Sequence, residues 1–343
     1  MLILADKYIP FLRGILEPFA RVSYLEPEEF TPAAVKDADA LLVRTRTRCD
    51  ATLLSGSRVR FIATATIGYD HIDTDYCDRH GIFLTNAPGC NAQGVCDYIE
   101  AALRYIESTL CHISATTATI GVIGVGHVGS LVAACARRRG YHVLLNDPPR
   151  EEAEASATTS VTTVTADTPA HDRFCPLDTI AREADIITFH TPLTRHGKYP
   201  TWHLCDDIFL RMCKPGVVII NAARGGVIDE EALLQTSNNN RLPAPKYIID
   251  TWQNEPHINK NLLDRALIGT YHIAGYTLQG KINATNICLA ALCRHFSLPD
   301  LSVSKEALPL HTPPEDDWLL AVDRQLRAHP DDFETLRESY PLR

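Results

Sequence analysis

The sequence predicts an α/β protein made of two doubly wound domains, each built on a parallel sheet. Short apolar runs alternate with amphipathic stretches of helical length along most of the chain, a pattern typical of parallel βαβ units. The length of 343 residues supplies material for two domains or more. A glycine-rich turn lies near residue 124, far from the N-terminus, so we expect a separate domain to precede it.

Short apolar runs bounded by turn residues mark the strands. The expected strands are residues 2–5, 40–43, 61–64, 83–86, 120–125, 142–145, 186–190, 217–221, 246–250 and 268–271. Two long helical patterns, at about 91–110 and 278–296, flank the strands of the second half. Both would connect the same pair of domains, which indicates that one domain is inserted into the other.

The expected domain boundaries follow from this insertion. Residues 1–93 and 277–298 form a discontinuous domain that would bind substrate, and residues 94–276 form the inserted one. Residues 299–343 are rich in proline and too few to form a core alone, so this short tail should pack on the body or on another subunit. Residues 151–170, rich in Ala, Thr and Ser, are expected to be a surface loop.

Composition narrows the class of function. A net charge of −9 argues against a nucleic-acid partner, because phosphate backbones need a basic surface. No apolar run approaches the roughly 20 residues that span a bilayer, and Asp6 and Lys7 interrupt the N-terminus too early for a secretion signal. The 11 cysteines are scattered without a C-x-x-C pair and read as reduced thiols, so we expect a cytoplasmic protein.

The segment 119–147 reads as a strand, a glycine turn, a helix and a second strand with an acid at its end. Gly124 permits the tight turn, Gly126 lets the backbone approach a pyrophosphate, and Gly129 lets helix and strand pack closely. Asp147 would bind the adenosine ribose and repel a 2′-phosphate, which favours NAD over NADP. An ordinary structural turn is the alternative. The expected cofactor-binding residues of this motif are Gly124, Gly126, His127, Val128, Gly129 and Asp147.

Arg224, Glu255 and His272 each follow a predicted strand, where α/β proteins place ligand-binding groups. This set suits hydride transfer at a hydroxyl-bearing carbon. His272 would remove the hydroxyl proton, and Glu255, bonded to the other ring nitrogen, would fix the tautomer. Arg224 offers a planar fork for a carboxylate. A histidine satisfied within the core is the alternative for His272.

These motifs resemble the NAD-dependent D-2-hydroxyacid dehydrogenases, over about residues 1–298. The similar segments are 124–129, 190–193, 221–229, 250 and 255–256. The resemblance implies that Arg224, Glu255 and His272 are catalytic and that further NAD contacts come from Thr191, Ala222, Ala223, Asp250 and Gly275.

More particular segments, 42–45, 64–68, 87–92, 147–149 and 272–281, resemble family members that act on a small phosphorylated 2-hydroxy acid, 4-phospho-D-erythronate. This resemblance implies substrate contacts by Thr45, Thr66 and Tyr276, and a homodimer. The tail after 298 is shorter than the dimerisation domain usual in these members, and residues 154–172 look like an insertion. Both departures lie outside the catalytic motifs.

Arg44, Arg46 and Arg48 alternate after the strand expected at 40–43, so all three would point to one face and could hold a phosphate and a carboxylate. Arg44, nearest the strand, is the favoured substrate contact. A solvated edge is the alternative. Asp70, His71 and Asp73 have neither zinc nor calcium spacing, so no metal is expected and Asp73 is interpreted as a helix cap.

Two other functions stay open. One is a different D-2-hydroxyacid dehydrogenase, such as a phosphoglycerate dehydrogenase, for which the Arg44 face and Tyr276 would not matter. The other is an NAD(H)-sensing binding protein without catalysis. The complete set of Arg224, Glu255 and His272 argues against a pure binder, which needs no acid–base group.

Overall fold

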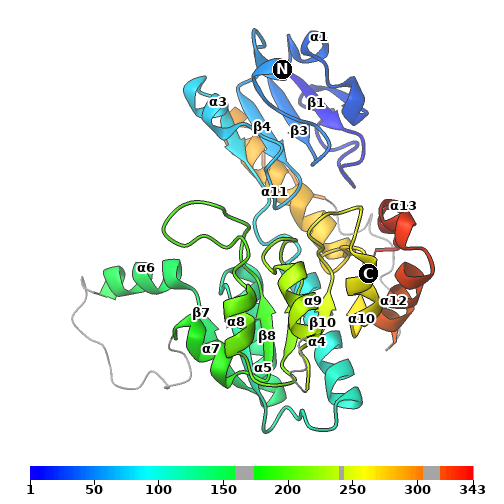
Figure 1. The fold of residues 1–343 in the computed structure, drawn as a ribbon. Helices are drawn as coiled ribbons and strands as arrows, with labels where there is room; N and C mark the ends of the chain where they lie inside the picture. Colours follow the sequence, from blue (N-terminus) through cyan, green and yellow to red (C-terminus); the bar gives the residue numbers. More distant parts are fainter. Residues whose placement is uncertain (159–173, 239–242, 304–316, 343) are drawn as a thin grey trace. The chain divides into compact units, whose positions relative to one another are not determined.

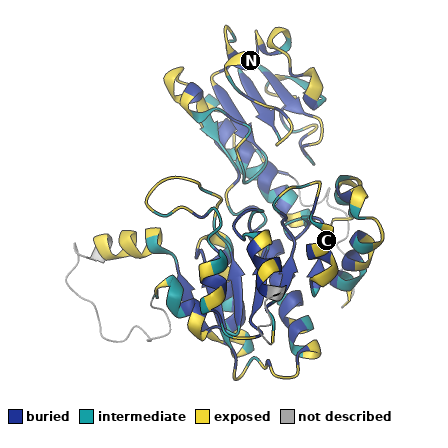
Figure 2. Ribbon diagram, in the orientation of Figure 1, coloured by how far each residue is buried: buried dark blue, intermediate teal, exposed yellow. Residues whose placement is uncertain are grey.

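The structure is a computed structural model that describes residues 1–158, 174–238, 243–303 and 317–342 (Figure 1). The chain divides into two compact units. Unit 1 comprises Met1–Asn91, Tyr276–Pro313 and Leu342–Arg343, and unit 2 comprises Ala92–Gly275 and Pro314–Pro341. In both units the sheet strands are mainly buried and the exposed residues lie mostly on helices and loops (Figure 2). Among the described residues, none of the helices is both long and apolar enough to cross a membrane.

Unit 1 contains a five-stranded parallel sheet in the order β2-β1-β3-β4-β5. The strands are β1 (Leu2–Asp6), β2 (Arg21–Leu25), β3 (Ala40–Val43), β4 (Phe61–Thr64) and β5 (Phe83–Thr85). The helices are η1 (Pro27–Glu29), α1 (Pro32–Val35), α2 (Ala51–Leu54), α3 (Thr74–Arg79) and α11 (Leu278–Phe296).

Both faces of this sheet are covered, which explains why its strands are continuous apolar runs. Leu41 of β3 points into a core shared with α2 and α3. Its neighbour Leu42 belongs to a second core with Leu289 and Leu292 of α11. The helix that returns from far along the chain therefore completes unit 1.

Unit 2 contains a six-stranded parallel sheet in the order β11-β10-β9-β8-β6-β7. The strands are β6 (Thr119–Ile123), β7 (His142–Asn146), β8 (Ile186–Phe189), β9 (Val218–Asn221), β10 (Lys246–Ile249) and β11 (Ile268–Gly269). The helices are α4 (Ala92–Thr109), α5 (His127–Arg139), α6 (Pro148–Thr158), α7 (Leu177–Glu183), α8 (Asp207–Met212), α9 (Glu230–Asn238), α10 (Lys260–Arg265), α12 (Trp318–Ala328), η4 (Pro330–Asp332) and α13 (Phe333–Ser339). From β6 the chain adds β7 on one side and β8 on the other, so the direction of strand addition reverses between β6 and β8. Doubly wound sheets bind their ligands at such a point.

The predicted fold class, two parallel-sheet α/β domains, is confirmed. All ten expected strands occur, with ends displaced by at most two residues. Strand β2 was not predicted, because its residues are only partly buried and mix polar with apolar side chains. The prediction of a loop at 151–170 is wrong for residues 151–158, which belong to helix α6. Residues 159–173 lie outside the described residues, and so does most of the insertion expected at 154–172.

Residues 317–341 of the C-terminal tail pack against the β11 side of unit 2. The Asp323 Oδ1 atom of α12 accepts a hydrogen bond of 2.7 Å from the Gly269 backbone N–H. Arg327 donates to the carbonyl oxygens of Leu263 (2.6 Å) and Ala266 (2.8 Å). Phe333, the first residue of α13, is fully buried. The tail thus covers the edge of the sheet.

Candidate active site

His272 and Glu255 form a hydrogen-bonded pair near the ends of β10 and β11. His272 Nδ1 lies 2.7 Å from Glu255 Oε2. The second carboxylate oxygen of Glu255 accepts a 2.8 Å bond from the Trp252 backbone N–H, so both oxygens are engaged. The side chains of His272 and Glu255 are 35% and 18% exposed, which leaves the histidine ring the more accessible of the two. A fixed carboxylate on Nδ1 leaves Nε2 as the nitrogen that can exchange a proton with a ligand.

The two residues shift each other's pKa. Burial by itself would lower the pKa of His272, but the charge of Glu255 and its hydrogen bond outweigh burial and raise that pKa. Burial would raise the pKa of Glu255, yet the interaction with His272 leads the opposing effects and lowers it. The imidazolium form is therefore favoured relative to a free histidine.

Asp250 holds the backbone that carries His272. The buried carboxylate of Asp250 accepts bonds from the N–H groups of Ile273 (2.8 Å) and Ala274 (3.0 Å) and from the Thr270 hydroxyl (2.7 Å). His272 itself has a positive φ of 59°, a conformation that a non-glycine residue adopts only when its surroundings impose it. Asp250, expected to contact NAD, has its oxygens occupied by this loop.

Arg224 lies in the turn between β9 and α9, next to the loop that carries Glu255. A Cβ atom added to Gly225 would lie 1.8 Å from the Trp252 carbonyl oxygen, so only glycine allows these two backbones to touch. The Arg224 guanidinium donates to the Ala223 carbonyl oxygen at 2.8 Å. The three predicted catalytic residues thus lie on adjacent strand ends of one sheet.

A cavity of about 610 Å³ borders the glycine motif in unit 2. Of the predicted cofactor residues, those that line it are Gly124, Gly126, Asp147 and Thr191. Those that do not are His127, Val128, Gly129, Ala222, Ala223, Asp250 and Gly275. Gly129 lies behind the turn, where an added Cβ would be 1.9 Å from the Gly124 carbonyl oxygen.

The cavity has the features that a dinucleotide needs. A Cβ added to Gly126 would meet nothing within 4 Å, so space is open beside this backbone. Helix α5 begins directly after Gly126 with no side-chain cap, and His127 and Val128 are its first residues. The buried Thr191 hydroxyl has no hydrogen-bond partner among the described residues. Asp147 binds the Val125 N–H at 2.8 Å, which fixes the acid at the end of β7.

The predicted substrate residues Arg44, Thr45, Thr66 and Tyr276 all belong to unit 1. Strand β3 ends at Val43, and the chain turns there with a 3.1 Å bond from Thr47 N–H to the Arg44 carbonyl oxygen. Strand alternation therefore does not extend to the arginines.

Within that turn Arg48 pairs with Asp50 at 2.7 Å, whereas Arg44 is half-buried. The Thr66 hydroxyl lies 2.7 Å from that of Thr64 and donates to the Gly68 carbonyl oxygen at 2.9 Å. The Lys281 ammonium lies 4.4 Å from the ring centroid of Tyr276.

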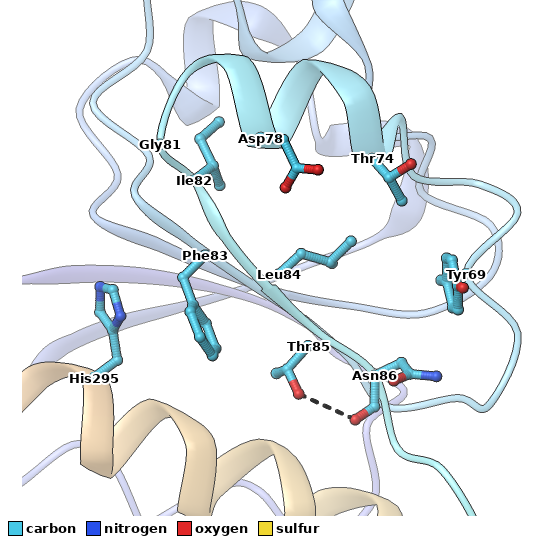
Figure 3. Close-up of a pocket in the computed structure, with 10 residues that line it drawn as sticks. All are labelled: Tyr69, Thr74, Asp78, Gly81, Ile82, Phe83, Leu84, Thr85, Asn86 and His295. Carbon is cyan, nitrogen blue, oxygen red and sulfur yellow. Dashed lines mark hydrogen bonds between the residues drawn. The ribbon is translucent and has the colours of Figure 1, made fainter. Parts of the chain in front are cut away.

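A second cavity, of about 700 Å³, lies beside β5 in unit 1 (Figure 3). It is lined by Tyr69, Thr74, Asp78, Gly81, Ile82, Phe83, Leu84, Thr85, Asn86 and His295. None of the residues predicted to bind ligand lines it. Among the described residues, no group of three or more His, Cys, Asp or Glu side chains could hold a metal ion. Asp73, the interpreted cap, does accept a 2.8 Å bond from Tyr76 N–H at the start of α3.

Two charged residues near the His272–Glu255 pair were not found from the sequence. Burial raises the pKa of Glu230 to about 7, and the negative charge of Glu255 contributes in the same direction. Arg337 of α13 lies with Nη1 3.8 Å from Glu255 Oε2. Glu230 follows the strand-end motif directly, a signal that could have found it. Arg337 comes from the tail, far from every recognised motif.

Comparisons with known proteins show the family of the chain. The family described as "D-isomer specific 2-hydroxyacid dehydrogenase, NAD binding domain" matches residues 104–274. An erythronate-4-phosphate dehydrogenase of Bacteroides fragilis is 46% identical over 354 residues, covering 100% of this chain and 97% of that protein. One of Porphyromonas gingivalis is 38% identical, covering 99% and 92%.

Solved structures share the fold. The NAD-bound 3-phosphoglycerate dehydrogenase of Entamoeba histolytica has a TM-score of 0.67 at 24% identity, covering 89% of this chain and 99% of that one. The D-lactate dehydrogenase of Aquifex aeolicus, complexed with NAD and lactic acid, has a TM-score of 0.65 at 22% identity, covering 87% and 96%. The family and the NAD cofactor expected from the sequence are confirmed. The chain belongs to the erythronate-4-phosphate dehydrogenase family, within the D-isomer-specific 2-hydroxyacid dehydrogenases.

Proposed function

We propose that this chain oxidises the 2-hydroxyl of 4-phospho-D-erythronate to 2-oxo-3-hydroxy-4-phosphobutanoate with NAD, a step of pyridoxal phosphate biosynthesis. The observation that carries the proposal is the 2.7 Å bond between His272 and Glu255, which prepares an acid–base group. The names of the relatives supply the substrate.

His272 is the base of the proposed reaction. Its Nε2 takes the proton of the 2-hydroxyl while the hydrogen on C2 departs as hydride, and the C2–O bond becomes a carbonyl. Glu255 stabilises the imidazolium that forms. Arg224 holds the substrate carboxylate by paired N–H bonds and polarises the new carbonyl oxygen. Bound NAD supplies the hydride acceptor.

The remaining predicted roles are part of the same proposal. NAD contacts are assigned to Gly124, Gly126, His127, Val128, Gly129, Asp147, Thr191, Ala222, Ala223, Asp250 and Gly275, within a cofactor domain of residues 94–276. Substrate contacts are assigned to Arg44, Thr45, Thr66 and Tyr276, within a substrate domain of residues 1–93 and 277–298. The open space at Gly126 supports the first set, as does the Thr191 hydroxyl, which has no hydrogen-bond partner in the described part of the chain. Positive charge at Arg44 supports the second.

We also assign a homodimer in the cytoplasm, with the short C-terminal segment 299–343 as its dimerisation-like part. The resemblance supports the dimer. The 11 cysteines are all free thiols, which fits a reducing compartment.

The decisive assay follows NADH absorbance with a panel of D-2-hydroxy acids. The panel contains 4-phospho-D-erythronate, D-erythronate without the phosphate, 3-phospho-D-glycerate and D-lactate. We expect the highest kcat/KM for 4-phospho-D-erythronate, and a drop of at least about tenfold when the phosphate is removed, because a charge-assisted phosphate contact contributes about 1.5–3 kcal/mol. A preference for 3-phospho-D-glycerate would contradict the substrate assignment. NADH binding without oxidation of any acid would contradict catalysis.

A further inference from the structure

The geometry points to Arg337 of the C-terminal helix α13 as a positioning residue for the His272–Glu255 pair. This inference rests on the proposed role of His272 as the base. It gives the C-terminal tail a role in the reaction, in addition to the contact between subunits that is proposed for it.

The guanidinium of Arg337 stands beside the same carboxylate oxygen that binds His272. Arg337 Nη1 lies 3.8 Å from Glu255 Oε2, and that oxygen lies 2.7 Å from His272 Nδ1. The Arg337 side chain is only 24% exposed, and its buried Nε has no hydrogen-bond partner among the described residues. Glu334, one turn earlier in α13, receives a 2.9 Å bond from Nη2 and orients the guanidinium.

The tail is anchored on the segment that leads into His272. Tyr271, the preceding residue, donates its hydroxyl to Gln325 of α12 at 2.7 Å. Its ring also packs edge-on against Tyr340 at a centroid distance of 5.9 Å. Phe333 is fully buried at the start of α13. Contacts before and after Arg337 in the tail therefore fix the distance between its guanidinium and Glu255.

The positive charge of Arg337 stabilises the Glu255 carboxylate when His272 is in its neutral, basic form. Oxidation starts from neutral His272, and in that state the half-buried Glu255 would lose the positive partner that His272 provides when protonated. An unpaired carboxylate in such a place is costly. Arg337 supplies a permanent cation, because guanidinium does not deprotonate in proteins. Glu255 can then stay ionised and keep its hydrogen bond while His272 is neutral.

Other charges face the pair as well. Asp250 raises the pKa of His272, in the same direction as Glu255, whereas Arg337 lowers it. Glu230 faces Glu255, and its own pKa, raised by burial to about 7, places a second titration near neutral pH. Of the charged groups named here, removal of Arg337 leaves Asp250, Glu230 and Glu255, all of them acidic, so the pKa of His272 should rise. The base form would then appear at higher pH.

The test compares Arg337→Gln and Arg337→Lys with Arg324→Gln, a matched control that removes a cation from an exposed position of α12. The pH profile of kcat/KM is measured for 4-phospho-D-erythronate oxidation. Arg337→Gln should move the acidic limb upward by about 0.5 pH unit, less than the 1–3 units of a direct partner. Arg337→Lys should restore most of this shift, and Arg324→Gln should match the parent protein.

An NMR titration of histidine carbons in the NAD-free protein, with His272→Gln used to assign the signal, measures the same pKa without substrate. It separates His272 from Glu230, and it keeps failure of the proposed function distinct from failure of this inference. An unchanged His272 pKa in Arg337→Gln would overturn the inference. So would a rise in substrate KM with an unmoved acidic limb, since that result makes Arg337 a substrate ligand. If Arg337→Gln fails to fold, the titration of Glu334→Gln decides, because this change removes the carboxylate that shares the guanidinium. The pKa of His272 should then fall, and an unchanged pKa overturns the inference.

Discussion

Separate carboxylates hold the backbone and the ring of His272. The Asp250 carboxylate accepts hydrogen bonds from the N–H groups of Ile273 and Ala274, the two residues after His272. These bonds maintain the positive φ of His272. Glu255 holds Nδ1 of the ring. Neither contact can be replaced by the other, because one sets where the side chain begins and the other sets how the ring is turned. The nitrogen that faces a ligand is defined only when both are present.

Replacing His272 by Gln should lower kcat for oxidation by at least about 10²-fold, the usual loss when an acid–base group is removed. NADH binding, measured by fluorescence, should change little, because the cavity beside the glycine motif does not include this side chain. A variant that keeps near-normal kcat would remove His272 from the mechanism.

Replacing Glu255 by Gln should shift the pH profile in the direction opposite to Arg337→Gln. The pKa of His272 is raised because Glu255 outweighs burial; without the carboxylate, burial lowers it. His272 then stays neutral down to a lower pH. The acidic limb of the kcat/KM profile for oxidation should therefore move to lower pH by about 1 unit or more. The plateau should fall too, because the ring loses its fixed tautomer. An upward shift would contradict this account of the pair.

At the scale of single elements, the turn between β6 and α5 separates two uses of glycine. A side chain at Gly126 would enter open space, whereas one at Gly129 would collide with the Gly124 carbonyl oxygen at 1.9 Å. The first glycine leaves room for a ligand, and the second lets α5 lie against β6. This difference yields a matched pair of variants.

Gly126→Ala should fold with nearly unchanged stability but bind NAD at least about tenfold more weakly, equivalent to 1.4 kcal/mol. Gly129→Ala should lower the free energy of unfolding by about 1–3 kcal/mol or more, as overpacking does. Urea denaturation and calorimetric titration with NAD measure the two quantities. Equal NAD affinity in Gly126→Ala and the parent would place the diphosphate elsewhere.

Strand ends explain which parts of the site could be predicted. Arg224, Glu255 and His272 follow apolar runs that really are adjacent strands, so a one-dimensional pattern located them. The same reasoning fails for the arginines after β3. Side chains alternate between faces only within a strand, and β3 ends at Val43, before the first arginine. Arg337 has no strand beside it in sequence. Its contact with Glu255 depends on how the tail folds back, which no local periodicity records.

At the scale of the whole molecule, residues 317–341 of the tail belong structurally to unit 2. Phe333 is its fully buried aromatic anchor. Phe333→Ala should lower the free energy of unfolding by about 3–5 kcal/mol, the usual cost of emptying such a site, and should also reduce kcat because α13 carries Arg337. Phe333→Leu, which keeps most of the volume, should retain more of both. Urea denaturation and the NADH assay test this. Full activity in a Phe333→Ala protein that remains folded would separate the tail from the reaction.

The contact between α12 and β11 also constrains how copies of the chain can associate. A short outer strand with free N–H groups invites another polypeptide to add to the sheet. Here the Gly269 N–H of β11 already donates to the Asp323 carboxylate, and Arg327 binds the carbonyl oxygens of Leu263 and Ala266 at the end of α10, just before the strand. The chain's own helix α12 therefore opposes the addition of a strand from another polypeptide at this edge of the sheet.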